Sequence, residues 1–507
     1  MNRAYEKEVE STCDYSLPDY MGDLKKLLCV SARPIPSARF PSEDSVEYSG
    51  VVEYSALYAD SDGKLTSITT SSDYDLSIPA GEGYKDSDGR VRLASVSTRV
   101  AGPRKISFRS QLALRSDVVS EDIPPLSGGG AEREDLEVLS SSVQVEEAIF
   151  ASLPEREYAE EAARLDGAYA DDVEIIASSG AVRIIESVVE EGAVVVKGEL
   201  IISVILRTSE QPPYAIRKVI PFEERITREE ITTDMAAISK ASLSSVRAAV
   251  SEDGESAVIT VNAISDLSAA LYKNESVSVV KDAYLRDSDY DLKLEKRLFS
   301  ERLYTASGEE RIVHTVPRGE IGLDGVREIL KLHADANITE KSIEDDGVRI
   351  LGNIAICGVA CEINPDSSIS YIPIRINAPM NVFVKSGCRF DEDCEIDAVV
   401  TPFEVESAID QDRLRLTVGL HIDTSVRRSR EVRCVAECNP VAGDASVQRR
   451  SVITVYYPDS GETLFDVAKA FRSTVARIAL DNSLTESVYK SAETVLSDIG
   501  AKSLIIT

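Results

Sequence analysis

Six of the eight cysteines form three closely spaced pairs in the last third of the chain. The pairs are Cys357/Cys361, Cys388/Cys394 and Cys434/Cys438. Each separation is even, which places both thiols on one face of a β-strand and makes a thiolate metal site or oxidative cross-linking conceivable. Zinc sites favour tighter spacing in turns, however, and cysteine is a common small buried residue, so packing is the expected role. Cys13 and Cys29 are isolated, and we expect them to be inert.

Other reactive side chains form no recognisable catalytic set. His314, His333 and His421 lie in different settings without a neighbouring nucleophile, and a lone histidine is usually structural. The chain has no G-x-x-x-x-G-K-[ST], H-E-x-x-H or G-x-S-x-G motif. We therefore expect no enzyme activity, no metal and no cofactor. The one basic cluster, at 427–433, is compatible with an acidic partner, but a solvated hairpin is the expected structure.

Composition narrows the classes of partner. The 507 residues carry 56 basic and 87 acidic side chains, a net charge of −31, with 43% hydrophobic residues. This charge opposes binding to nucleic acids and to anionic lipid. The first residues lack an apolar export signal, and the longest apolar run, 194–206, contains Lys197 and Glu199 and is too short to span a bilayer. We expect a soluble cytosolic protein with no direct membrane insertion.

The elements that position these residues are repeated three times. Three segments centred on a glycine alternate apolar and other residues in the same phase, which predicts β-strands with one buried face. The segments are 46–58 around Gly50, 194–206 around Gly198 and 348–360 around Gly352. A glycine inside a strand indicates a bulge or a close backbone approach. The period of about 150 residues predicts three copies of one domain.

Each copy shows a second shared feature downstream of its glycine. The pairs are Tyr74 with Ile78, Phe222 with Ile226, and Met380 with Val384. Upstream, Ile184 and Ile338 lie at equal distances before their glycines, whereas the first copy has Pro34-Ile-Pro36 and is expected to lack this element. Further short strands are predicted at 106–109, 258–263 and 414–418, and a short helical piece at 325–333. We place repeat 1 at 20–126, a linker with inter-repeat strands at 127–164, repeat 2 at 165–318 and repeat 3 at 319–446.

The C-terminal region, 451–507, has a different pattern. A strand at 452–457 leads through a turn to Leu464, Val467, Ala468 and Phe471, which fall on one face of a helix. Thr463 is placed to cap this helix with Asp466, and Thr474 to cap a second one ending near Asn482. A last strand at 503–507 completes a small α+β domain of the order βααβ. The whole chain is thus expected to be mainly β, with three tandem β-rich domains before this tail.

Two family resemblances follow from these motifs. The string S-G-E-T-L-x-x-V-A-x-x-F-x-S-T-V-x-x-I-x-x-x-N, from Ser460 to Asn482, is similar to the LysM motif. The string G-x-x-x-V-x-G-E-L-x-x-S-V, followed by I-P-F-x-E-x-I, resembles the SPOCS domain of sporulation and spore-coat proteins, best in the second copy at 192–226. SPOCS copies followed by one LysM domain resemble the SipL-like spore morphogenetic proteins of clostridia.

The resemblance implies a function and a site. It implies a non-enzymatic scaffold for spore-coat assembly in the mother-cell cytosol, at the forespore surface. Its implied partner is the coat morphogenetic ATPase, a stage IV sporulation protein A-like protein, bound through the tail. The candidate partner- or glycan-binding residues are those of the two tail loops: Asp459, Ser460, Gly461, Glu462, Thr463, Asn482, Ser483 and Leu484.

Several alternatives remain open. Gly461, Thr463 and Asn482 also have purely structural readings as turn, cap and local hydrogen-bonding residues. The segment between Asn482 and the last strand is longer than in typical LysM domains, which weakens the expectation of a glycan groove. The second candidate function is binding of peptidoglycan, an N-acetylglucosamine polymer, at the cell wall. A third is an enzyme hidden in the third copy.

Overall fold

The three glycine-centred segments are β-strands, as predicted, and the structure makes each of them the middle strand of an antiparallel meander. The computed structural model describes residues 2–81, 83–120, 133–209, 211–366, 368–441, 453–484, 494–498 and 500–507. The meanders are β2 (Leu24–Pro41), β3 (Ser45–Asp60) and β4 (Leu65–Pro79); β8 (Val173–Glu190), β9 (Ala193–Thr208) and β10 (Tyr214–Thr227); and β14 (Val326–Glu344), β15 (Gly347–Ile363) and β16 (Ile369–Lys385). The middle strand is the most buried in each because it packs on both neighbours.

Each meander faces a second three-stranded sheet. These sheets have the strand orders β1-β6-β5, β11-β12-β7 and β13-β18-β17. Their strands are β1 (Asn2–Ser16), β5 (Tyr84–Gly102), β6 (Lys105–Ser120), β7 (Leu136–Asp166), β11 (Ala236–Asp253), β12 (Ser256–Leu285), β13 (Tyr290–Pro317), β17 (Glu395–Asp410) and β18 (Arg413–Pro440). Short 3₁₀ turns, Ala170–Asp172 and Gly319–Ile321, precede β8 and β14. We call β1–β6 unit 1, β7–β12 unit 2 and β13–β18 unit 3. The three units share one topology, and the mainly β fold is confirmed.

The three central glycines occupy equivalent environments. Each is covered by a large side chain from the next strand of its meander, which is its cross-strand partner. The covering side chains are Tyr74 over Gly50, Phe222 over Gly198 and Met380 over Gly352. A Cβ added at Gly198 would lie 2.5 Å from Phe222 Cζ, so only glycine fits. The first residue of each downstream pair identified in the sequence is therefore the side chain that covers the glycine.

A bulge in the preceding strand accompanies every glycine. The register shifts fall between Pro36 and Ala38, Ile184 and Glu186, and Ile338 and Glu340. The expectation that the first copy lacks the upstream element is wrong. Pro36 lies opposite Gly50 at the bulge, where a residue without an N–H is tolerated.

Strand pairing places the boundaries of the three units at other residues than those expected for the three repeats. β1 pairs with β6, so unit 1 begins before residue 20. β7 pairs with β12 and belongs to unit 2 rather than to a linker, and β13 pairs with β18 and belongs to unit 3. The first and last strands of a unit meet across its whole length, and local sequence patterns carry no signal for that pairing. The glycine-rich stretch 127–130 lies outside the described residues.

The helical piece expected at 325–333 is the start of strand β14. Its pairing with β15 shifts register between Val326 and Glu328 and again between Ile329 and Lys331. Each shift turns the following side chains to the other face. The buried residues Val326, Leu330 and Ala334 therefore recur every four positions, which imitates a helical period.

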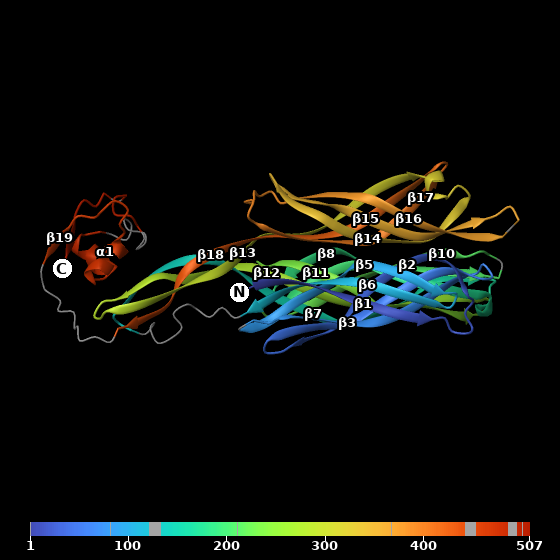
Figure 1. Cartoon of the computed structure of the whole chain (residues 1–507), viewed down its shortest axis with the longest axis horizontal. Helices are drawn as coiled ribbons and strands as arrows, with labels where there is room; N and C mark the ends of the chain where they lie inside the picture. The colour runs from blue at the N-terminus through green and yellow to red at the C-terminus, as the bar shows by residue number, and fades with distance from the viewer. Residues whose placement is uncertain are drawn as a thin grey trace.

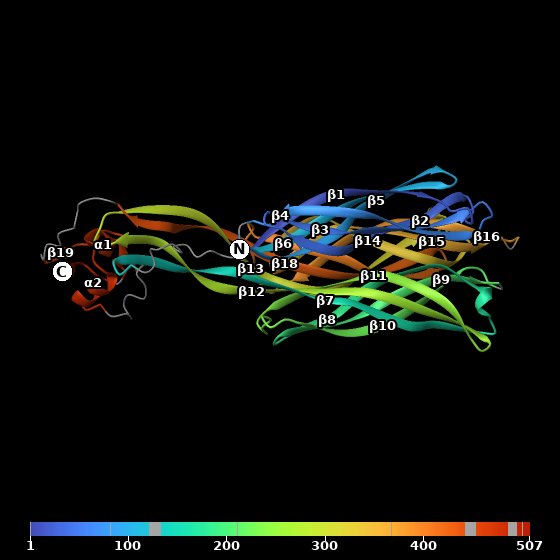
Figure 2. The same cartoon turned by 90° about the horizontal axis from the view of Figure 1, so that it is seen from below.

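The three units lie side by side and form an elongated body. In Figure 1 unit 3 lies along one side of units 1 and 2, and Figure 2 shows units 1 and 2 next to each other. All three contribute to one buried cluster, which we call the apolar joint: Leu28, Cys29, Leu57, Ala59, Leu65, Ile176, Ile205, Leu330, Val359, Cys361 and Tyr371. Burial of apolar side chains therefore holds the units together at the end of the body where β3, β9 and β15 end.

Buried ion pairs join the same units near the other end. Arg302 of unit 3 makes two hydrogen bonds, of 2.9 and 3.1 Å, to the Glu146 carboxylate of unit 2 and lies 3.4 Å from the centre of the Tyr272 ring. Arg427 of unit 3 donates to Asp117 Oδ2 of unit 1 at 2.7 Å. We call Asp117, Glu146, Arg302 and Arg427 the ionic joint; all four side chains are at least 88% buried.

The ionic joint corrects one prediction and marks the base of an arm. The cluster 427–433 is not a solvated hairpin but part of β18, with Arg427 turned inward. Beyond the joint, the long strands β7, β12, β13 and β18 extend away from the body (Figures 1 and 2). The arm consists of two ribbons, β7 paired with β12 and β13 paired with β18. Buried side chains from both ribbons hold the arm together: Ala283, Leu285, Val435 and Cys438.

The tail lies at the tip of this arm and has the predicted order. It consists of β19 (Thr454–Tyr456), α1 (Leu464–Phe471), α2 (Val475–Asp481) and β20 (Leu504–Ile506). The two strands pair antiparallel, and Leu464, Val467, Ala468 and Ile478 form the core with Leu504 and Ile506. None of the helices in the described ranges is long and apolar enough to cross a bilayer.

Candidate functional site

The first candidate loop uses most of its polar groups internally. Thr463 caps α1 by accepting a hydrogen bond from Asp466 N at 3.2 Å, while Asp466 accepts from Thr463 N at 2.9 Å. Glu462 accepts from the Tyr456 hydroxyl and from Asp459 N, both at 2.8 Å. Gly461 has a φ of +92°, which its turn requires. Asp459, Ser460 and Gly461 are the exposed members.

The second candidate loop closes the domain. Asn482 donates to Ile478 O at 2.8 Å and to Ile505 O at 2.7 Å, and it accepts from Ile505 N at 2.6 Å. This side chain therefore ties the end of α2 to β20. Leu484 packs against the tail core, whereas Ser483 is exposed with a φ of +54°.

The segment before the last strand contacts the first loop. Leu496 N donates to Glu462 O at 2.9 Å, and Thr463 forms an isolated bridge with Val495. Backbone groups of residues 462–463 in the first candidate loop are thus paired within the protein itself. Residues 485–493 lie outside the described residues.

The tail is fixed to the arm by a face that sequence analysis missed. Tyr284 of β12 is fully buried against the tail core, stacks edge-on with Phe465 at 5.3 Å and donates to Ser473 O at 2.6 Å. Lys469 pairs with Asp282 at 2.6 Å, and Arg472 pairs with Asp289. Burial raises the pKa of Tyr284 above its ordinary value, so its hydroxyl stays protonated as a donor. The arm therefore carries the tail in a set orientation.

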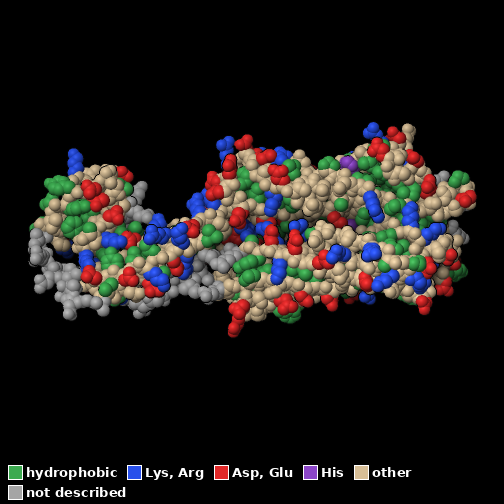
Figure 3. All heavy atoms as spheres, in the orientation of Figure 1, with side chains coloured by type: hydrophobic (Ala, Val, Ile, Leu, Met, Phe, Trp, Pro, Cys, Tyr) green, Lys and Arg blue, Asp and Glu red, His purple; other side chains and the backbone are tan. Residues whose placement is uncertain are grey.

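The outer face of the tail sheet is apolar and exposed. Tyr456 and Leu504 turn towards the helices, so their neighbours turn outward. Ile453, Val455 and Tyr457 are 72%, 55% and 71% exposed, and Ile505, opposite Val455, is 44% exposed. Figure 3 shows apolar side chains gathered on the tail surface. The signal was present in the sequence, because 453–457 is apolar in both alternating phases apart from Thr454.

The reactive residues of the body are dispersed. Within the described ranges, no group of three His, Cys, Asp or Glu side chains is placed to hold a metal ion. His314 and His421 lie on β13 and β18, and His421 Nε2 is 3.1 Å from Asp423 Oδ1. Cys361, Cys394, Cys434 and Cys438 are buried as expected, but Cys388 is exposed. Cys388 and Cys394 lie between β16 and β17 rather than on one strand.

The expectation that Cys29 is isolated is wrong. Its Sγ lies 3.2 Å from the Sγ of Cys357, which belongs to unit 3. The two residues are 328 positions apart in the chain, so only the packing of the units brings them together.

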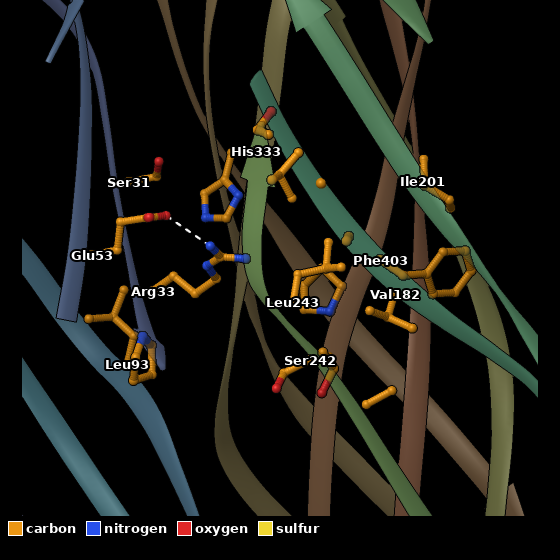
Figure 4. A pocket seen from close by; sticks show the side chains of 18 of the residues that line it. Ser31, Arg33, Glu53, Leu93, Val182, Ile201, Ser242, Leu243, His333 and Phe403 are labelled. Atoms are coloured by element: carbon orange, nitrogen blue, oxygen red, sulfur yellow. Dashed lines mark hydrogen bonds and ion pairs between the residues drawn. The ribbon is translucent and has the colours of Figure 1, made fainter. Parts of the chain in front are cut away.

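A cavity of about 1290 Å³ separates the three units beside the apolar joint. Figure 4 shows Arg33 and Glu53 paired on one wall, with His333 pointing towards them and Leu243 and Val182 on another. Its lining mixes charged, hydroxyl and aliphatic side chains from every unit and brings together no recognisable catalytic set. We regard this cavity as the space left where the three units meet side by side.

One part of the chain is similar to a known protein family. A family model described as "SipL, SPOCS domain" matches residues 173–251, which are β8, β9, β10 and most of β11 of unit 2. No curated protein and no solved structure matches the chain. Residues 173–251 are therefore similar to the SPOCS domain of SipL, and this similarity connects the chain with sporulation.

Proposed function

We propose that this protein is a non-enzymatic scaffold for spore-coat assembly, acting in the mother cell at the forespore surface. The SPOCS match in unit 2 supports the sporulation role, and the common topology of the three units supports three SPOCS-like domains. The LysM-like tail then binds a coat morphogenetic protein, the stage IV sporulation protein A-like ATPase. Several modules in one chain raise the effective concentration of each at an assembling layer.

The observation that carries the proposal is the way in which the tail is presented. Contacts of Tyr284, Lys469 and Arg472 fix one side of the tail to the tip of the arm. The exposed apolar face of β19 and β20 is left for contact with another molecule. Exposed apolar groups of this kind on an otherwise charged protein are typical of protein contacts.

The pairing inside the loops favours a protein over a glycan as the partner. Asn482 and Glu462 are engaged in internal hydrogen bonds, and Glu462 O is taken by Leu496. A protein partner needs no free backbone groups in these loops, since it can bury Val455 and Tyr457 directly. The second loop acts in this proposal by holding β20 in place.

The test uses the full chain with the purified coat ATPase and, separately, purified peptidoglycan. We expect Val455→Glu to weaken binding to the ATPase about tenfold or more, because it puts a charge at the centre of the contact. Ala470→Glu adds the same charge at an exposed position of α1 and is the matched control. Leu464→Asp, which disrupts the tail core, should abolish binding.

Two results would contradict the proposal. One is retention of ATPase binding by Leu464→Asp with an unfolded tail, which would place the contact elsewhere. The other is binding to peptidoglycan but not to the ATPase, which would support the cell-wall function.

A further inference from the structure

Cys29 and Cys357 face each other across the contact between units 1 and 3. Cys29 lies on β2 and Cys357 on β15, and both are free thiols with their Sγ atoms 3.2 Å apart. A disulfide bond is about 2.0 Å long, so the sulfur atoms need to approach by only about 1 Å. The two sulfur atoms are thus already close to bonding distance.

The surrounding contacts hold the two strands in place. Leu28, next to Cys29, and Val359, two residues after Cys357, belong to the apolar joint and are at most 1% exposed. Lys26 Nζ donates to Tyr371 O at 3.1 Å and adds a polar link between β2 and β16. The thiols therefore meet as part of a fixed interface and not by chance at a mobile surface.

The charges near the pair favour a reactive thiolate. His333 and Arg375 are the cross-strand neighbours of Cys357 on β14 and β16, and Lys331 lies close by on β14. The hydrogen bond from Cys357, with smaller effects of Lys331, His333 and Arg375, lowers the pKa of Cys29 to about 7 against the opposing effect of burial, whereas the same hydrogen bond and burial raise the pKa of Cys357. A thiolate is the form that attacks a disulfide.

Access is available from the side of Cys357. Cys29 is buried, but Cys357 is half-buried. Neither cysteine lines the cavity between the units, whereas Lys331 and His333 beside Cys357 do, and Figure 4 shows His333. A small oxidant therefore reaches the pair through Cys357.

We propose that Cys29 and Cys357 form a reversible disulfide that covalently joins unit 1 to unit 3. The oxidant is a low-molecular-weight disulfide. One cysteine thiolate attacks it, forms a mixed disulfide and releases the first small thiolate. The second cysteine, after losing its proton to solvent, attacks the protein sulfur of this mixed disulfide and releases the second small thiol. One small disulfide is reduced to two thiols while two cysteines are oxidised to one cystine.

The disulfide would link units 1 and 3 covalently without changing the fold of either unit. It closes a loop across 328 positions, and long closed loops restrict the unfolded chain most. Oxidation would thus stabilise the contact between units 1 and 3. This inference does not rest on the function of the tail.

The experiment treats the reduced full chain with glutathione disulfide and maps disulfides by mass spectrometry without reduction. We expect a peptide linking Cys29 to Cys357 in the monomer fraction, and a Tm that rises on oxidation and returns with dithiothreitol. Cys29→Ser and Cys357→Ser should each abolish the linked peptide and the Tm shift. Cys361→Ser is the matched control and should retain both, because Cys361 lies on the same strand and burial raises its pKa to about 11.

The proposal is overturned if the exposed Cys388 is fully converted to its mixed disulfide while no Cys29–Cys357 peptide forms. It is equally overturned if Cys29→Ser leaves the oxidation-dependent Tm shift intact. The mapping of wild-type protein decides the matter even if a serine variant folds poorly.

Discussion

The apolar joint and the ionic joint connect the same three units by different physics. The apolar joint includes Leu28 near the start of β2, whereas Asp117 of the ionic joint pairs with Ala4 near the start of β1, at the opposite end of unit 1. Aliphatic contact is non-directional, so the apolar joint holds the units together without selecting one alignment of their strands. The ionic joint needs particular atoms to meet, because a buried charge without its partner is costly.

This difference has a consequence for the arm. Arg302 and Glu146 lie on β13 and β7, two of the four strands that continue beyond the body towards the tail. A fixed register at this point sets the direction in which both ribbons leave the body. We infer that the apolar joint provides cohesion and that the ionic joint aims the arm.

The largest expected effect comes from breaking the ionic joint. Arg302→Ala leaves the Glu146 carboxylate buried without its main partner and should lower the free energy of unfolding by about 3–5 kcal/mol. Chemical denaturation of the full chain measures it. Lys296→Ala is the control, because Lys296 lies on the same strand as Arg302 but its pair with Glu431 of β18 is at the surface and should contribute less than about 1 kcal/mol.

A double variant sharpens the result. Arg302→Met with Glu146→Leu removes both charges and should recover most of the stability lost in Arg302→Ala. If the body is stable again but the arm direction changes, as seen by small-angle scattering, the aiming role is supported. Equal losses from Arg302→Ala and Lys296→Ala would show that burial of the pair is not the cause.

A smaller effect is expected at the apolar joint. Leu330→Ala removes a side chain that is 1% exposed and should cost about 2–4 kcal/mol through lost burial and a cavity. The arm should keep its direction. Leu298→Ala, at a position that is 52% exposed on β13, is the control and should change stability little. A change of arm direction in Leu330→Ala would contradict the division of roles.

The smallest effect is a dependence of the ionic joint on acid. Burial would raise the pKa of Asp117, but Arg427, which also donates a hydrogen bond, and Arg302 and Arg115 hold it below its ordinary value. Its stabilising contribution is therefore present above the unfolded pKa of about 3.9 and is lost as the pH falls through the folded value. Wild type should exceed Asp117→Asn in stability at pH 6, and the gap should narrow at pH 3. A gap that widens in acid would contradict this sign.

The candidate site was partly predictable because much of it is local. Thr463 and Asp466 are three residues apart, and the cap forms as the spacing predicts. Asn482 has the structural role that its position after α2 allows, although its partner Ile505 lies near the chain end. The contact between the tail and the arm was not predictable, since Tyr284 lies 181 residues before Phe465 and no local pattern marks it as a tail contact.

The sequence by itself determined the three glycine-centred strands, their repetition in three copies and the order of the tail. Alternation, caps and turns act between residues a few positions apart, so their signals lie within short windows. Only the tertiary structure decided that the outer strands of each unit pair end to end, that Arg427 is buried and that Cys29 meets Cys357. These contacts join residues about ninety or more positions apart, and they form because whole faces are buried together rather than because neighbouring residues prefer one conformation.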